Sequence, residues 1–205
     1  MLIAYIWVLW CIKMNDKEKA IRITKSFLEK NEIYKDYIVD SSNILERESL
    51  WYIPFKELNP DPNNFLVGAY NGIIVDKSSS DFLQPGSALS LEEWIYGFEI
   101  GIRGKRYDLI IDKVIDYRKT LEILSKIGLK FVEIEVENGT EWKIPKDFKR
   151  KEIKNRLDKL PCKFKNQSFT YSIGEFKEIR NEQIFEYRLE ITENNDSSIL
   201  GELSN

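Results

Sequence analysis

The chain has 205 residues, of which 42% are hydrophobic and 13% aromatic, and its 31 Lys and Arg residues against 34 Asp and Glu residues give a net charge of −3. This length allows one large domain or two small ones, and the apolar content suffices for a packed core. Because there is no basic excess, the charge balance gives no support to nucleic-acid binding or to attraction by an anionic membrane.

Histidine is absent from the sequence, which excludes catalytic and metal sites built on imidazole. The two cysteines, Cys11 and Cys162, are far apart in the sequence, which argues against a disulfide framework and a thiolate metal cluster. No glycine-rich phosphate-binding loop is found either. We therefore expect no metal and no cofactor, and the cysteine usage predicts a reducing, cytoplasmic location.

The N-terminus carries an apolar run, LIAYIWVLWCI (2–12), that is shorter than the roughly 18 residues of a membrane span. Just after it, Asn15 and Glu18 have the spacing of a capping box, which predicts an amphipathic helix over 16–30. Residues 1–13 are interpreted as an upstream start-site extension, and a genuine membrane anchor is the alternative. A membrane is an expected partner only in that second case.

The predicted elements up to the first domain boundary follow in chain order: strands over 34–39 and 50–55, a turn at 59–64, a hairpin of 66–70 and 73–77 around Asn71-Gly72, and a helix that begins at Ser90 and ends at Gly104. Ser90 and Glu93 form its capping box, and Trp94 lies on its apolar stripe. These elements make a first unit over 14–105.

The predicted elements of a second unit over 106–192 also follow in order: strand 107–114, a helix between the cap Asp116 and Gly128, hairpin 131–145, helix 147–160, a helix opened by a Ser172 and Glu175 capping box, and strand 184–192. Residues 193–205 contain acidic but no basic side chains and are predicted to be a flexible tail. The fold class is α+β: two small units, each an antiparallel sheet with amphipathic helices packed on one face.

The 131–145 hairpin has a clean alternation of apolar and charged residues. A two-residue turn at Asn138-Gly139 would mix the two kinds on each face, which is costly wherever one face is buried. A three-residue loop, 137–139, would instead pair Ile134 with Trp142, and Trp142 is assigned to the core together with Trp51 and Trp94. The predicted outer face and loop then carry Glu133, Glu135, Glu137, Glu141 and Lys143.

Three interpretations of this charged hairpin stay open. A solvated strand face is the simplest. An acidic patch that docks a basic partner is the second. The third takes Glu141 and Lys143 as part of a divalent-metal-dependent nuclease site, completed by Asp112 or Asp116.

The first unit resembles the immunity protein 35 family, which is also seen in YrhB-like proteins. The resemblance covers about residues 15–103 and rests on AIRITKSFLEKN, WYIPF, GIIVDK and GSALSLEEWIYGFE, in that order. One departure is the turn after IIVDK, where the family usually has Thr-Gly and this chain has Ser79-Ser80.

The resemblance implies a bacterial immunity protein of a polymorphic toxin system. Such a protein binds and neutralises a cognate protein toxin in the cytoplasm without catalysis. The alternatives are the nuclease and a protein-interaction module of unassigned function.

Overall fold

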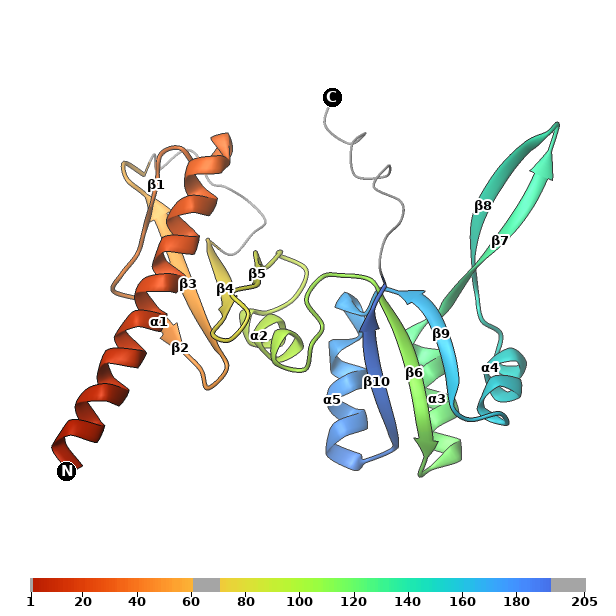
Figure 1. Cartoon of the computed structure of the whole chain (residues 1–205). Coiled ribbons are helices and arrows are strands. Elements are labelled where there is room, and N and C mark those ends of the chain that lie inside the picture. Colours follow the sequence, from red (N-terminus) through yellow and green to blue (C-terminus); the bar gives the residue numbers. More distant parts are fainter. Residues whose placement is uncertain (1, 61–70, 193–205) are drawn as a thin grey trace. The chain divides into compact units, whose positions relative to one another are not determined.

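The computed structural model describes residues 2–60 and 71–192, with side chains from Asp16 onward. The chain forms two compact units that divide between Ile100 and Gly101, a few residues before the boundary predicted from the sequence (Figure 1). Both units combine helices with antiparallel sheets. The α+β class is thereby confirmed.

The first unit is built around one antiparallel sheet with the strand order β1-β3-β4-β5, in which β2 also pairs with β3. Its elements are α1 (Leu2–Lys30), a 3-10 helix (Glu32–Tyr34), β1 (Tyr37–Val39), β2 (Leu45–Glu46), β3 (Leu50–Glu57), β4 (Gly72–Asp76), β5 (Phe82–Leu83) and α2 (Leu91–Glu99).

Helices cover both faces of this sheet. Trp51 and Ile53 of β3 pack in one cluster with Leu28 of α1, whereas Tyr52 packs in another with Trp94 of α2. Because successive strand residues point to opposite faces, α1 and α2 lie on opposite sides of the sheet (Figure 1). The sequence predicted helices on one face only. The run of six buried residues that opens β3 provides an apolar surface for each helix.

Helix α1 begins at Leu2, so the predicted helix start at Asn15 is wrong. Residues 2–14 contain neither proline nor glycine, and nothing in that segment stops the helix from extending upstream of the capping-box pattern. Among the described residues, none of the helices combines the length and the apolar character that a membrane span requires.

Gly72 is the first residue of β4 and lies opposite Pro54 of β3. The predicted partner strand, 66–70, lies outside the described residues. A Cβ at Gly72 would be 2.5 Å from the ring atoms of Tyr52. The glycine therefore permits the close approach of a tyrosine ring, which the Asn-Gly turn signal does not reveal.

The capping box of α2 is confirmed. The Ser90 backbone N–H donates to Glu93 Oε2 at 2.8 Å, and Ser90 Oγ accepts from the Glu93 N–H at 3.2 Å. The helix ends at Glu99, and not at Gly104 as predicted. Gly101 has a φ of +91°, a left-handed conformation that terminates the helix one turn earlier.

The second unit contains a three-stranded sheet, β10-β6-β9, and a separate two-stranded hairpin, β7-β8. Its elements are β6 (Tyr107–Val114), α3 (Tyr117–Ile127), β7 (Lys130–Glu137), β8 (Thr140–Asp147), α4 (Arg150–Leu157), β9 (Cys162–Gln167), a 3-10 helix (Thr170–Ser172), α5 (Ile173–Glu182) and β10 (Phe185–Ile191). Strand β9 was not predicted, although Cys162 and Phe164 alternate with lysines there and are buried. The predicted tail lies outside the described residues.

The helix ends of this unit agree with the sequence in one case and disagree in another. Asp116 caps α3 by accepting from the Lys119 N–H at 3.0 Å, and Gly128 follows the helix with a φ of +69°. The Ser172 and Glu175 capping box is wrong. The buried Ser172 hydroxyl donates to the carbonyl of Ile127 at 3.4 Å and makes no cap.

Candidate functional site

The β7-β8 hairpin has a different register from the predicted one. Glu137 pairs with Thr140, Ile134 with Lys143, and Glu135 with Trp142, so the turn is the two-residue Asn138-Gly139. Both turn residues have positive φ, 52° and 78°, as a type I′ turn requires. The predicted three-residue loop is wrong because its premise, one buried face, does not hold.

The structure does not place the five predicted binding residues on one face. Residues directly opposite each other in an antiparallel pair share a face. Glu133, Glu135 and Glu137 therefore lie with Trp142, whereas Glu141 and Lys143 lie with the valines and Ile134 on the other face. Each face carries both charged and apolar side chains.

Large hydrophobic side chains of the hairpin are exposed to solvent on both faces. The fractional exposures are 52% for Val132, 58% for Ile134, 67% for Val136 and 56% for Trp142. Trp51 and Trp94 are buried as predicted, but the prediction of a core position for Trp142 is wrong. Contiguous exposed apolar groups of this kind are typical of interaction surfaces.

The base of the hairpin is anchored to the second unit by aromatic contacts. The ring centroids of Phe131 and Phe148 are 4.9 Å apart, and those of Phe148 and Phe164 of β9 are 5.3 Å apart. The guanidinium of Arg156 lies 4.6 Å from the Phe148 ring centroid. Figure 1 shows the two strands extending away from the three-stranded sheet beyond this anchor. The hairpin is thus fixed at its base and presents its strands to solvent.

Lys146 links two of the glutamates on the Trp142 face. Its ammonium contacts Glu133 and lies 3.0 Å from Glu135 Oε1. The hydrogen bonds to Glu133 and Glu135 raise the pKa of Lys146 above its ordinary value. With Glu137 on the same face, three carboxylates stand against one ammonium, so this face keeps a negative excess.

The residues of the nuclease interpretation are separated in the structure. Glu141 and Lys143 share a face of β8, but Val136 and Ile134 lie opposite them. Asp112 is bound by Arg188, and Asp116 caps α3. In the described ranges, no group of three or more His, Cys, Asp or Glu residues could hold a metal ion.

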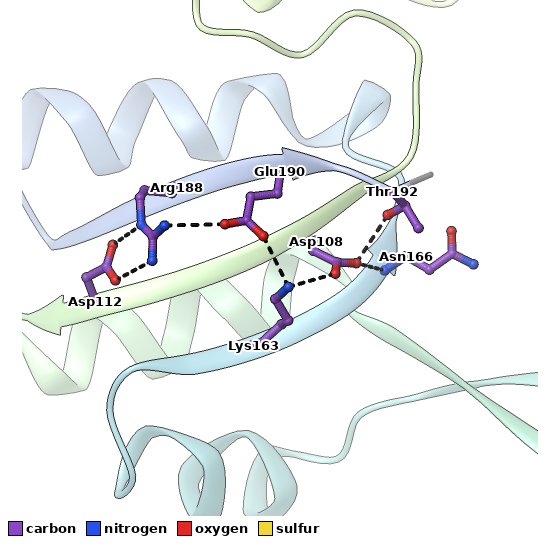
Figure 2. Close-up of polar contacts among 7 residues, drawn as sticks. All are labelled: Asp108, Asp112, Lys163, Asn166, Arg188, Glu190 and Thr192. Carbon is purple, nitrogen blue, oxygen red and sulfur yellow. Dashed lines mark hydrogen bonds and ion pairs between the residues drawn. The ribbon is translucent and has the colours of Figure 1, made fainter. Parts of the chain in front are cut away.

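A second polar surface covers the outer face of the β10-β6-β9 sheet (Figure 2). Arg188 Nε and Nη2 donate to Asp112 at 2.8 and 3.1 Å. Lys163 lies 3.0 Å from Asp108 and 3.1 Å from Glu190. The β6 residue between the two aspartates on this face, Ile110, is only 6% exposed, although it faces away from the helices.

Each charged side chain drawn on this outer face in Figure 2 has an oppositely charged partner. Burial acts to raise the pKa of Asp108, but hydrogen bonds from the Asn166 N–H, Lys163 and Thr192 outweigh it and lower that pKa. The hydrogen bond from Arg188 lowers the pKa of Asp112. Asp108 and Asp112 are four residues apart on β6 and therefore share a face. Lys163 and Asn166, two of the partners of Asp108, lie on β9, which was not predicted from the sequence. The alternation of lysines with Cys162 and Phe164 is the signal that could have found them.

The Cys162 thiol is an unreactive part of the core. Cys162 is buried, and burial raises its pKa to about 11, which disfavours the nucleophilic thiolate.

The exposed hairpin is therefore the strongest candidate surface, and its apolar side chains are suited to contact with another molecule. Compared with known proteins, the chain matches no family model, no curated protein and no solved structure.

Proposed function

We propose that this protein is a non-catalytic binding protein of the immunity type, which neutralises a cognate protein toxin through the β7-β8 hairpin. The observation that carries the proposal is the exposure of Val132, Ile134, Val136 and Trp142 on two faces of one hairpin. A solvated strand face would carry polar residues at these positions. The resemblance of residues 15–103 to immunity protein 35 supports the toxin as the class of partner.

The energetics of a two-stranded hairpin also favour a binding role. Two strands without a covered face are at best marginally stable in water, and in the part of the chain that the structure describes the aromatic anchor lies at the base, at Phe131 and Phe148. A partner that covers either face would remove apolar side chains from water. A central exposed tryptophan such as Trp142 is a residue type that often dominates binding energy.

The proposal is tested by neutralisation and not by capture alone. The full chain serves as bait in a lysate of the source organism, and a captured protein is then expressed with and without the chain. We expect the captured protein to arrest growth alone and to be harmless with the chain. The variant Val136→Asp combined with Trp142→Ala should lose this protection, and Leu58→Asp, at an exposed position of the first unit, serves as the matched control.

A nuclease assay separates the enzyme alternative. The purified chain is incubated with labelled DNA and RNA and with Mg²⁺ or Mn²⁺. The proposal expects intact nucleic acid. Cleavage that disappears in Glu141→Gln and Lys143→Met would contradict it and would favour the metal-dependent nuclease.

A further inference from the structure

We infer that the outer edge of β7 is a docking edge for an extended strand of the partner, whose side chains alternate between apolar and basic. The inference rests on the proposed function, since it takes the partner to be a protein. It concerns the backbone of the hairpin as well as its side chains.

The register defines the two edges of the hairpin. Residues that flank a two-residue turn, here Glu137 and Thr140, exchange both backbone hydrogen bonds, and bonded and non-bonded pairs then alternate along the ladder. The pairs of Ile134 with Lys143 and of Val132 with Pro145 are therefore non-bonded. Their N–H and C=O groups point away from the partner strand, to the outer edges of β7 and β8.

A contact at the base of β7 supports this assignment. Lys130 is the next outward residue in the same series as Val132 and Ile134. Its N–H donates to Gln167 Oε1 at 2.8 Å, and its carbonyl accepts from Gln167 Nε2 at 2.6 Å. The buried Gln167 side chain thus occupies the place of a paired strand at the first position. Within the described residues, β7 pairs with no strand except β8.

The two edges differ in their ability to accept a strand. The outer edge of β8 contains Pro145, which has no N–H to donate, and proline at such a position blocks edge pairing. The remaining outward residues of β7 are Val132, Ile134 and Val136, and each of them has a backbone N–H to donate. β7 is therefore the open edge, and it continues from the position that Gln167 fills.

The side chains of β7 define the chemistry of the incoming strand. On one face, Glu133, Glu135 and Glu137 exceed the single positive charge of Lys146. On the other face, the β-branched Val132, Ile134 and Val136 are exposed. Opposite charges and β-branched neighbours stabilise cross-strand pairs. A strand that alternates basic with apolar residues complements both faces.

The same charges disfavour a second copy of this chain as the occupant. If two β7 strands paired antiparallel about Ile134, Glu133 of each copy would lie opposite Glu135 of the other. Like charges directly opposite each other destabilise a sheet. The glutamates thus favour a basic strand over self-pairing.

The test uses the full chain and three capped eight-residue peptides. One alternates lysine with valine, one has the same composition in blocks, and one alternates glutamate with valine. Binding is followed by backbone amide NMR shifts. We expect the alternating basic peptide to bind best, with the largest shifts at Val132, Ile134 and Val136. Two charge contacts predict about tenfold weaker binding of the glutamate peptide.

Two sets of variants make the test specific. Ile134→Pro removes one outward N–H of β7, and Lys143→Pro is its matched control on the outer edge of β8. We expect the first to abolish peptide binding and the second to leave it within about threefold. Glu133→Lys combined with Glu135→Lys should reverse the preference toward the glutamate peptide. A reversal cannot arise from unfolding of the hairpin.

The outcomes separate this inference from the proposed function. Equal binding of all three peptides, or Ile134→Pro binding like the unaltered chain, would overturn the docking edge. So would concentration-dependent dimerisation that protects the β7 amides from exchange, because a second copy would then be the occupant. If Ile134→Pro still neutralises a captured toxin, the edge is refuted and the proposed function stands. If the peptides bind as expected but the captured protein is not a toxin, the edge stands and the proposed function fails.

Discussion

Strands β3 and β4 of the first unit differ from strands β7 and β8 of the second in how the sequence pattern relates to burial. β3 and β4 are runs of consecutive apolar residues, and nearly all of their side chains are buried. β7 has a clean alternation, yet nearly every position of β7 and β8 is exposed. An alternating pattern therefore predicts which residues share a face, but it does not predict whether that face is covered.

The largest expected effect comes from a matched pair of isoleucines, one in each kind of strand. Ile53 of β3 is fully buried, whereas Ile134 of β7 is 58% exposed. Ile53→Ala should lower the free energy of unfolding by about 2–5 kcal/mol through lost burial and a cavity. Ile134→Ala should lower it by less than about 1 kcal/mol. Urea unfolding followed by circular dichroism measures both, and similar losses for the two variants would refute the comparison.

The second prediction concerns glycine in a covered strand. Gly72→Ala brings a Cβ to 2.5 Å from the Tyr52 ring, and overpacking of this kind should cost about 1–3 kcal/mol of unfolding free energy. At Gly174 in α5, by contrast, a Cβ would enter open space. Gly174→Ala should therefore be neutral or stabilise by up to about 1 kcal/mol. If thermal unfolding shows that Gly72→Ala, like Gly174→Ala, is neutral or stabilising, close packing at Gly72 does not limit the stability of the protein.

The contrast between covered and exposed strands shows how far the sequence could predict this protein. Local signals were sufficient where they are satisfied locally: the caps at Ser90 and Asp116 and the stop at Gly128 were all predicted correctly. Signals whose meaning depends on a distant partner were not sufficient. The close approach of the Tyr52 ring to Gly72 and the hydrogen bond from Ser172 to the carbonyl of Ile127 both depend on the tertiary structure.

The candidate site was predicted in its residues but not in its geometry. The hairpin segment and its charged residues were identified from alternation and the Asn138-Gly139 signal. The register was wrong because it assumed that one face is buried, and burial is a property of what packs on the strand. With both faces exposed, the favoured two-residue turn determines the pairing.

A third kind of strand surface sharpens the comparison, because the outer face of β6 is polar yet internally paired. Asp108 is 15% exposed and accepts hydrogen bonds from the Asn166 N–H and Thr192. Asp108→Asn removes its charge and should cost about 1 kcal/mol at pH 7. The pKa of Asp108 is lowered in the folded state. Its contribution is therefore present above the unfolded pKa, near 4, and is lost as the pH falls through the folded value.

Urea unfolding at pH 7 and pH 3 tests this pH dependence. The difference in unfolding free energy between the unaltered chain and Asp108→Asn should shrink at the lower pH. If the difference stays constant between the two pH values, the charge of Asp108 does not contribute and this face is no more stabilising than the exposed hairpin.

The smallest expected effect lies at the turn that follows the buried strand β4. Ser80 has a φ of +67°, and a left-handed backbone costs a residue with a Cβ roughly 1–2 kcal/mol. Ser80→Gly removes that cost, while the greater flexibility of glycine in the unfolded chain offsets about 0.5–1 kcal/mol of it. The net gain should be about 0.5 kcal/mol, visible as a higher urea midpoint. Ser79→Gly is the matched control and should lose stability, because Ser79 has no positive φ and its hydroxyl accepts from the Asp81 N–H at 3.2 Å. Equal losses in both variants would mean that the Ser80 backbone carries no strain.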